Sequence, residues 1–322
     1  MKSIKKQTGF TIVELLIVIV VIGILAAITI VAFNGVSNKA KVSAVQADLN
    51  NSAKTLETFR LTTSTTEQYP ADLVTANLKA SNGTTYQYSV DNTANPVTYC
   101  LTAINNNVTY YVGQGTQPKE GTCYENHGLV GWWQLNGNPN DSSGNGINGT
   151  VSGPTLTTGA NGTTNSAYSF VNASDAITIP AHTLLNNQTF TYTAWVRPSS
   201  ITGSMTVVGS GYNAPQLRID SGKPTLLATA AQQFSSSTGT IAANTWSYIG
   251  VTYSASGVFT YYINGVAAGS GTVARTFTFT SNYIGRTSTA SENFVGSIDG
   301  VRMYNRILSP AEMTSLYAST PQ

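Results

Sequence analysis

The sequence predicts an α+β unit, made of a long N-terminal helix and a small antiparallel sheet, followed by an all-β sandwich. Residues Leu15–Phe33 are largely apolar and carry no charge. Apolar residues then recur at three- and four-residue steps from Val42 to Phe59, which marks one face of a continuing helix. Beyond Leu129, short runs of alternating apolar and polar residues are separated by turns rich in Gly, Asn and Ser. This pattern of short strands is typical of a sandwich.

The composition is that of a protein with a polar but weakly charged surface. Charged residues make up only 9% of the 322 residues, against about 25% in an average soluble protein. The first nine residues hold three of the 16 basic side chains and none of the 14 acidic ones, so the rest of the chain is nearly neutral. Arg and Lys are scattered singly along it, whereas a nucleic-acid-binding surface would show them clustered. We therefore expect no nucleic-acid partner.

Positive charges precede the apolar run. Lys2, Lys5 and Lys6 lie before it, and the nineteen residues from Leu15 to Phe33 are uncharged. As a helix they would measure about 28 Å, close to the hydrocarbon thickness of a bilayer. The basic flank sets the orientation, with the leader on the cytoplasmic side. We expect a single-pass protein of the cytoplasmic membrane whose C-terminus lies outside.

The start of the apolar run carries a specific motif. Thr8-Gly9 is followed by Phe10, and Glu14 lies inside the apolar segment, so the sequence reads G-F-T-I-V-E-L-L. This motif resembles the leader of type IV prepilins. The resemblance implies that a prepilin peptidase cuts between Gly9 and Phe10 and that Phe10 is N-methylated. It also implies that Glu14 pairs with the N-terminal amine of a neighbouring subunit as a cell-surface pilus assembles.

A simple N-terminal membrane anchor is the alternative interpretation. It leaves Glu14 unexplained, although an ionisable group inside a membrane span costs a few kcal/mol. The segment also departs from the pilin pattern, since pilins often carry a proline about two-thirds along it, where Val31 stands here. Asn34-Gly35 is the nearest weak point, because glycine costs about 1 kcal/mol relative to alanine inside a helix. The sequence leaves open whether this helix keeps its order in a filament.

The rest of the first unit is predicted to be a small antiparallel sheet. Strands are expected at residues 84–90, 97–104 and 108–112, and three asparagines at 105–107 join the last two as a hairpin. A long helix whose outer half packs on such a sheet resembles the pilin architecture. The unit is therefore divided into a leader at 1–9, a transmembrane and assembly helix at 10–60, and a pilin globular part at 61–128.

The chain has two cysteines, Cys100 and Cys123. The orientation argument places both outside the membrane, where an oxidising compartment favours a disulfide. The bond would close a loop of 22 intervening residues, which contributes about 3 kcal/mol in the chain-entropy model. The position of the pair at the end of the first unit also resembles the disulfide-bounded region of pilins. A free pair of buried thiols is the alternative.

The second unit begins near Leu129 and consists of strands and turns. Asn264-Gly265 is the strongest hairpin signal, because both residues tolerate positive φ in a type I′ turn. Ser309 to Glu312 form a capping box that begins a short helix, whose Leu316 and Tyr317 would dock on the sandwich. Strands are expected at residues 129–135, 176–179, 190–196, 246–253, 258–263 and 295–304.

Five pieces of this unit carry a second resemblance. They are LVGWWQLNGNPNDSSGNGINGTV, AYSF, FTYTAWVRP, NTWSYIGVTYSASGVFTYYINGVAAG and FVGSIDGVRMYNRILSPAEMTSLY, in this order. Together they resemble the laminin-G-like, concanavalin A-type jelly-roll domains. The resemblance covers residues 129–322 and implies a jelly-roll sandwich that binds a ligand outside the cell.

Oxygen-rich residues near both ends of this unit are candidates for a structural calcium site. Asp141 and Asn145 flank a glycine near its start, and Asp299 precedes a glycine near its end. Laminin-G-like folds often bring these two segments side by side, and Ca²⁺ prefers carboxylate and carbonyl oxygens. The alternative is that these side chains only bond to the backbone of their own turns.

The sequence indicates a protein that is not an enzyme. Glycoside hydrolysis, an activity found among jelly-roll folds, mostly uses two carboxylates about 5 to 10 Å apart. No two acids of the second unit follow the i, i+2 or i+4 pattern that would place them on one face of a strand. His127 and His182 lie in turn-like segments with no nucleophilic partner indicated. The acids considered are Asp141, Asp175, Asp220, Glu292, Asp299 and Glu312.

These features predict a type IV pilus subunit that displays a laminin-G-like domain for adhesion or for recognition of a glycan or protein. A domain of about 190 residues is bulky for every position along a thin filament, which favours a minor or tip pilin. Expected partners are other pilin subunits, the prepilin peptidase, the membrane, and a glycan or cell-surface protein. Two alternatives stay open, a membrane-tethered lectin that never polymerises and a pseudopilin of a type II secretion machine.

Overall fold

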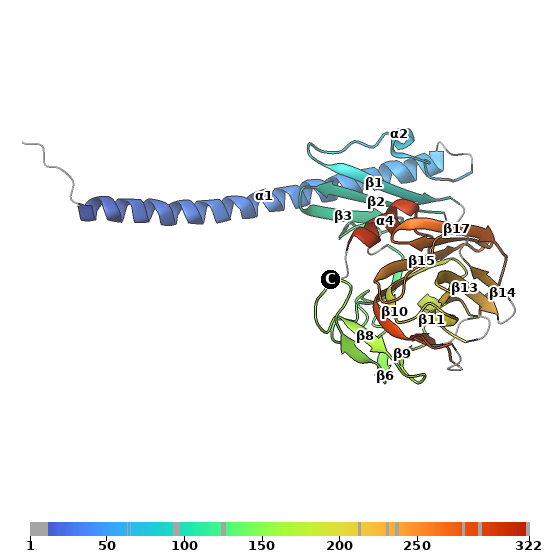
Figure 1. The fold of residues 1–322 in the computed structure, drawn as a ribbon. Coiled ribbons are helices and arrows are strands. Elements are labelled where there is room, and N and C mark those ends of the chain that lie inside the picture. Colours follow the sequence, from blue (N-terminus) through green and yellow to red (C-terminus); the bar gives the residue numbers. More distant parts are fainter. Residues whose placement is uncertain are drawn as a thin grey trace, which may run out of the picture. The chain divides into compact units, whose positions relative to one another are not determined.

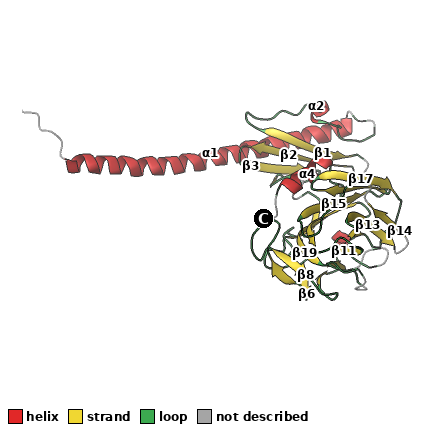
Figure 2. Ribbon diagram, viewed as in Figure 1, coloured by secondary structure: helices red, strands yellow, loops and turns green. Residues whose placement is uncertain are grey.

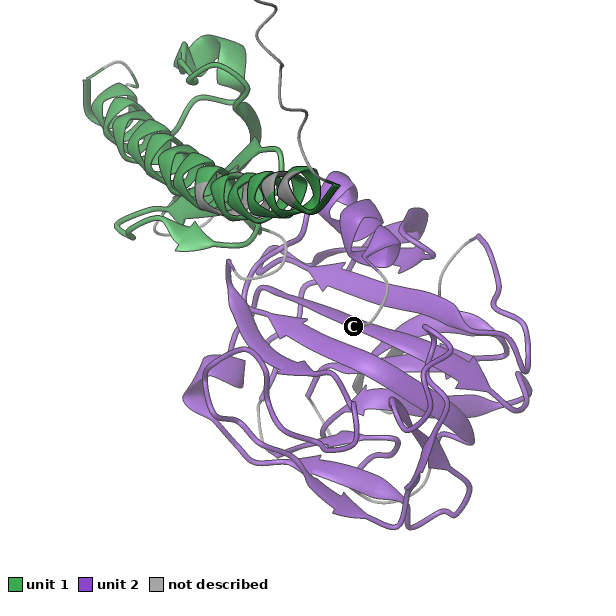
Figure 3. Cartoon of the chain, turned by 90° about the vertical axis from the view of Figure 1, so that its left-hand side faces the viewer, with its two compact units in different colours: residues 1–123 green, residues 124–322 purple. Residues whose placement is uncertain are grey.

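A computed structural model of the chain describes residues 12–62, 64, 66–92, 97–123, 127–211, 214–229, 232–235, 238–278, 281–288 and 292–319. The chain divides into two compact units, Met1–Cys123 and Tyr124–Gln322 (Figure 3). The long helix and the antiparallel sheets expected from the sequence are present, and each unit is considered on its own.

The first unit is built on α1, Ile12–Thr62 (Figure 1). The helix is continuous through Val31 and through Gly35, the weak point of the sequence. Its N-terminal half exposes large apolar side chains, with Ile17 at 56% and Phe33 at 74% exposure. Among the described residues, no helix reaches the combined length and apolar character needed to cross a membrane. The apolar surface of this half is thus not covered within the described chain.

The C-terminal half of α1 packs against a four-stranded antiparallel sheet. Its predicted stripe is buried, with Val45, Leu49 and Leu56 fully inaccessible to solvent. They form one core with Tyr99 and Leu101 of the sheet. The short helix α2, Leu73–Ala76, begins at its cap Asp72. The strands run in the order β1 Thr85–Asp91, β2 Thr98–Asn105, β3 Val108–Gly113 and β4 Lys119–Glu120.

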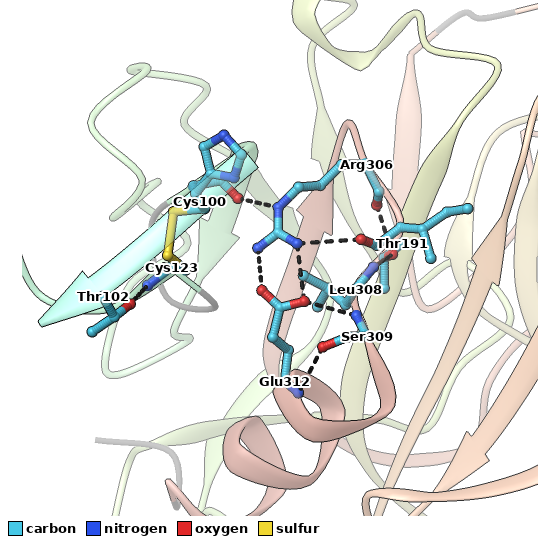
Figure 4. Close-up of polar contacts among 10 residues, drawn as sticks. Cys100, Thr102, Cys123, Thr191, Arg306, Leu308, Ser309 and Glu312 are labelled. Carbon is cyan, nitrogen blue, oxygen red and sulfur yellow. Dashed lines mark hydrogen bonds and ion pairs between the residues drawn. A yellow bond between two sulfur atoms is a disulfide. The ribbon is translucent and has the colours of Figure 1, made fainter. Parts of the chain in front are cut away.

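A disulfide joins Cys100 of β2 to Cys123, so the predicted bond is confirmed (Figure 4). Both cysteines are buried and pack against Tyr111. The backbone N–H of Cys123 also donates to Thr102 Oγ1 at 3.0 Å. The disulfide and this hydrogen bond fix the end of the first unit on the middle of its sheet.

The second unit is a β-sandwich of two antiparallel sheets (Figure 2). The eight-stranded sheet contains β5 Leu129–Trp133, β7 Thr155–Thr157, β8 Ala167–Phe170, β10 Phe190–Pro198, β15 Ser247–Tyr253, β16 Val258–Ile263, β17 Val266–Thr272 and β19 Gly296–Tyr304. The seven-stranded sheet contains β6 Thr150–Ser152, β9 Ala176–Ile179, β11 Ser204–Gly209, β12 Gln216–Asp220, β13 Lys223–Thr229, β14 Gln232–Ser235 and β18 Asn282–Ile284. A 3₁₀ turn, η1 Thr183–Leu185, lies between β9 and β10.

Alternation along the strands sorts apolar side chains into the space between the sheets. Trp133 is fully buried there and its indole N–H donates to the carbonyl of Ile147 at 2.9 Å. Phe190 stacks on Tyr253 with ring centroids 5.3 Å apart. The predicted hairpin is present, because Asn264 and Gly265 both have positive φ between β16 and β17. Positive φ at both positions is what a type I′ turn requires.

The last helix, α4 Pro310–Ala318, packs on the outer face of the eight-stranded sheet. The predicted capping box is confirmed, since Ser309 Oγ accepts from the N–H of Glu312 and the Glu312 carboxylate accepts from the N–H of Ser309. Leu316 is buried and Tyr317 stacks on Trp195 with centroids 5.5 Å apart. The predicted docking of this helix on the sandwich is confirmed.

The start of the second unit is tied to its end. The strand β5 pairs with β19, and the N–H of Asn305 donates to the carbonyl of Gly128 at 2.9 Å. Arg306 Nε donates to the carbonyl of His127 at 2.8 Å, while its terminal nitrogens hold both oxygens of Glu312 (Figure 4). Gly128 has φ +71, and a Cβ there would lie 2.8 Å from Asn305 Oδ1, so only glycine suits this approach.

Candidate functional site

A small recess lies on the outer face of the eight-stranded sheet, beside the end of α4. Pairing of neighbouring strands brings its residues together. Trp132 of β5 lies opposite Arg302 of β19. Trp195 of β10 lies opposite Tyr248 of β15. The recess has room for about one water-sized group. Its lining residues are Trp132, Gln134, Trp195, Tyr248, Gly300, Arg302 and Ser319.

Arg302 is the charged group of this recess. Its side chain lies over the ring of Trp132, with the guanidinium carbon 4.4 Å from the ring centroid, and the residue is only 8% exposed. Within the described part of the chain, its Nε–H has no hydrogen-bond acceptor and the guanidinium forms no ion pair. A buried cation without a counter-charge is rare in folded proteins, because desolvation penalises it.

Two buried hydroxyl groups lie near Arg302, those of Tyr248 and Thr193. Tyr248 Oη and Thr193 Oγ1 are buried, and neither forms a hydrogen bond of regular geometry with the described residues. The Tyr248 hydroxyl nevertheless lies close enough to Thr193 and Arg302 to interact with both side chains. Burial raises the pKa of Tyr248, so its hydroxyl remains a donor at neutral pH. Buried polar groups are nearly always hydrogen-bonded, to protein, water or a ligand. The recess therefore offers donors to an acceptor group that enters from outside.

Asp299 lies on the same strand, opposite Trp195. It is fully buried; its Oδ2 accepts from the N–H of Ala160 at 2.9 Å, and its Oδ1 has no partner among the described residues. Burial raises the pKa of Asp299 to about 7, although the N–H groups of Ala160 and Gly300 favour the charged form. This carboxyl holds the loop around Ala160 against the sheet.

Two segments of the chain match known protein families. Residues 171–314 match the concanavalin A-like lectin/glucanases superfamily, and residues 4–30 match the prokaryotic N-terminal methylation motif. The chain carries a concanavalin A-like domain behind an N-terminal methylation motif. No curated protein matches the sequence.

Solved structures similar to the chain include a domain of an extracellular arabinanase and the binding domain of a mosquitocidal protein. Domain 4 of AbnA, an extracellular arabinanase from Geobacillus stearothermophilus solved with arabinotriose, is 24% identical, with a TM-score of 0.51 over 59% of this chain and 98% of that one. The binding domain of Paraclostridial mosquitocidal protein 1 is 17% identical, with a TM-score of 0.49 over 62% of this chain and 53% of that one. The likeness to the arabinanase domain supports the β-sandwich fold of the concanavalin A-like domain.

The residues expected to hold calcium have other bonds in the concanavalin A-like domain. Asp141 Oδ1 accepts from the N–H groups of Trp132 and Ser143, and its Oδ2 accepts from the N–H of Ile147. Asn145 turns its NH₂ group, which cannot ligate a cation, toward the carbonyl of Val130 at 2.9 Å. Within the described residues, no three acids, histidines or cysteines gather as a metal site would require.

Calcium binding stays a prediction from the sequence. Melting of the full chain in calcium and in EDTA tests it, since binding to the native state raises the melting temperature. A rise that disappears in Asp299→Ala would establish the site. Identical melting curves in calcium and in EDTA would contradict calcium binding, and Asp141 and Asn145 would then serve only as hydrogen-bonding residues of the turn.

The other predicted site residues fall into two groups. Gly9 and Phe10 lie outside the described residues, and Glu14 lies in α1 with its side chain likewise outside them. The remaining acids of the second unit have structural partners: Asp175 accepts from the N–H of Val171, and Glu292 pairs with Arg218 at 2.8 Å. His182 accepts from the N–H of Leu184 at the start of η1.

Sequence reasoning did not single out Arg302, which the structure places at the centre of the recess. Alternation on β19 gives a signal in retrospect, because Val301 and Met303 belong to the core between the sheets and Arg302 lies between them in sequence. Nothing in the pattern of β19 shows that Trp132 and α4 cover this outer position.

Replacing Asp299 by Asn should remove a pH-dependent loss of stability. A carboxyl whose folded pKa of about 7 exceeds its ordinary value of 3.8 stabilises the fold fully below pH 4 and loses that contribution as pH rises to about 7. Each pKa unit corresponds to about 1.4 kcal/mol, so Asp299→Asn should be more stable than the parent by a few kcal/mol at about pH 8. Chemical denaturation at about pH 4 and about pH 8 measures the difference. Equal pH dependence in both proteins would contradict the assignment, and Asp220→Asn controls for the loss of one acid.

Proposed function

We propose that this protein is a type IV pilus subunit, in a minor or tip position, whose concanavalin A-like domain binds a glycan or a protein outside the cell. The observation that carries the proposal is the N-terminal methylation motif at residues 4–30 joined to a helix that exposes its apolar N-terminal half. An apolar surface of this size needs a cover, either lipid or other helices. Lipid would cover this surface while the protein is in the cytoplasmic membrane, and the helices of other subunits would cover it after polymerisation.

The second unit supports the display part of the proposal. It is a compact unit of its own, and the matching superfamily contains lectins as well as glucanases. Domain 4 of the arabinanase was solved with a trisaccharide, and we propose a comparable binding role here. The recess supplies hydrogen-bond donors and aromatic walls, but none of its described lining residues is a carboxylate. We therefore propose binding without hydrolysis.

Processing is the first test. We expect mass spectrometry of the purified protein to find Phe10 at the N-terminus, carrying one methyl group. The reason is that Gly9 stands at the boundary between the leader and the apolar run. Gly9→Val should retain the leader completely, whereas Thr8→Val should still be processed. A mature protein that begins at Met1, or after Ala27, would exclude the pilin assignment.

Assembly is the second test and addresses the function itself. Glu14→Ala should insert normally, because the span becomes more apolar, but its amount in sheared filaments should fall to background. Thr29→Ala is the matched control, since the Thr29 hydroxyl is bonded to the carbonyls of its own helix at Leu25 and Ala26. Immunoblots of sheared filaments and of membranes measure both variants. Parent protein that stays entirely with the membranes would indicate a tethered lectin instead.

A further inference from the structure

We propose that the recess beside α4 binds the carboxylate group of an acidic saccharide, with Arg302 as the principal contact. The inference rests on the proposed function, because it names the ligand class of the displayed domain. The recess has room for about one water-sized group, so an oxygen atom of the carboxylate enters it and the rest of that group stays at its mouth. The sugar ring stays at the rim, against the lining side chains.

The charge of Arg302 is the first argument. Arg218 and Arg306 are buried to a comparable degree, and each holds a carboxylate, Glu292 at 2.8 Å and Glu312 at 2.7 Å. Arg302 has no such partner within the described residues. Asp299, the acid that precedes it on β19, bonds instead to the N–H of Ala160. An anionic ligand group would supply the missing counter-charge, and it would recover desolvation energy that a neutral group cannot.

The donors define the shape of the group. The Nε–H of Arg302 has no acceptor among the described residues. The Tyr248 hydroxyl, which lies near Arg302, is a second buried donor on the same lining. A guanidinium presents its N–H groups in one plane, which matches the two oxygens of a carboxylate. Arg302 and Tyr248 thus offer N–H and O–H donors of the kind that a carboxylate accepts.

The walls favour a sugar as the carrier of the carboxylate. Trp132 and Trp195 line the recess, and tryptophan combines a broad apolar surface with a polar edge. Gln134 and Ser319 complete the lining with an amide and a hydroxyl that can bond to sugar hydroxyls. Small-molecule sites combine apolar walls with a few convergent polar groups, and this recess has that composition on a much smaller scale.

The experiment titrates the full chain in detergent micelles with three probes, sodium glucuronate, glucose and sodium acetate, and follows tryptophan fluorescence. Glucuronate should bind at least tenfold more tightly than either other probe, because only it combines the charge with the ring. Loss of a hydrogen bond to a charged group corresponds to about a tenfold change or more. Arg302→Gln should therefore bind glucuronate at least tenfold more weakly.

Two further variants test glucuronate binding if Arg302→Gln fails to fold. Gln134→Ala removes a lining side chain next to β5 and should weaken glucuronate binding several-fold with an unchanged circular dichroism spectrum. Arg197→Gln is the matched control, because Arg197 also lies over a tryptophan, Trp246, at 5.4 Å but does not line the recess. Its affinity for glucuronate should equal that of the parent.

Three results would overturn the inference. Equal affinity for acetate and glucuronate would indicate a general site for small anions, and equal affinity for glucose would remove the role of the charge. Displacement of glucuronate by a tripeptide with a free C-terminal carboxylate, but not by its amidated form, at lower concentration than any sugar would assign the recess to a protein ligand. Arg302→Gln should still enter sheared filaments, so failure of this proposal is distinguishable from failure of the display function, which Glu14→Ala tests.

Discussion

Glu312→Gln is expected to lower the free energy of unfolding of the concanavalin A-like domain by about 3 to 5 kcal/mol, the usual cost of breaking a buried ion pair. Arg306 and Glu312 form a two-pronged pair, with nitrogen–oxygen distances of 3.1 and 2.7 Å, and their side chains are 11% and 8% exposed. The neutral amide would leave the guanidinium buried without a counter-charge. It would also weaken the cap that Glu312 provides at the N–H of Ser309.

Urea denaturation followed by circular dichroism measures this loss. Glu67→Gln is the control, because Glu67 is 77% exposed and pairs with Arg60 at 3.6 Å, so its replacement should cost less than about 1 kcal/mol. The double variant Arg306→Met with Glu312→Leu should recover part of the stability, since apolar side chains often replace a buried pair without loss. Equal effects of Glu312→Gln and Glu67→Gln would contradict a buried pair.

The ion pair of Arg306 and Glu312 also predicts how the stability of the domain changes at low pH. Burial alone would raise the pKa of Glu312, but Arg306 and the N–H of Ser309 more than offset it, so the folded pKa lies below its ordinary value. A carboxylate with a lowered pKa stabilises the fold above its ordinary pKa, and the contribution disappears as pH falls through the folded value. The stability difference between the parent and Glu312→Gln should therefore shrink in acid.

Cys100→Ser is expected to lower the free energy of unfolding of the first unit by about 2 to 5 kcal/mol. The bond closes the segment between Cys100 and Cys123 and constrains the unfolded chain, and its loss also removes a buried contact with Tyr111. Cys123→Ser should have the same effect, because either change opens the same loop. The unfolding transition of the concanavalin A-like domain should stay where it is.

Denaturation with and without a reducing agent provides the check. Reduction of the parent protein should move the first transition to the position seen in Cys100→Ser, and it should not affect the variant further. Labelling of the native parent by a thiol reagent at both cysteines would contradict the disulfide. So would an unchanged transition after reduction.

The sequence was most informative where a feature is local. The turn at Asn264-Gly265 and the cap from Ser309 to Glu312 each depend on a few adjacent residues, whose conformational preferences are strong. The stripe of α1 followed from helical periodicity, because Val45, Leu49 and Leu56 repeat at the spacing of one helix face.

The recess could not be predicted in the same way. Trp132, Trp195, Tyr248 and Arg302 come from four strands whose neighbours in the sheet are far apart in sequence. Alternation assigns a residue to a face, but it does not say which strand lies beside it. The calcium prediction also depends on tertiary structure, since the proximity of Asp141 and Asp299 was inferred from the family resemblance, and it stays a prediction. In the structure, Asp141 bonds to its own turn and to the N–H of Trp132, and Asp299 bonds to the N–H of Ala160.

The pairing of β5 with β19 has a mechanical consequence for a domain that is held at one end. Tension applied at His127 enters the sandwich through β5, next to the hydrogen bonds that Gly128 and His127 accept from Asn305 and Arg306. A ligand held at the recess that Trp132 and Arg302 line would take up that load within a few residues of its entry point. The force would run across this one strand pair, and the seven-stranded sheet would be left out of its path. Resistance to pulling would then depend on how well β5 stays paired, and hardly on the stability of the rest of the sandwich.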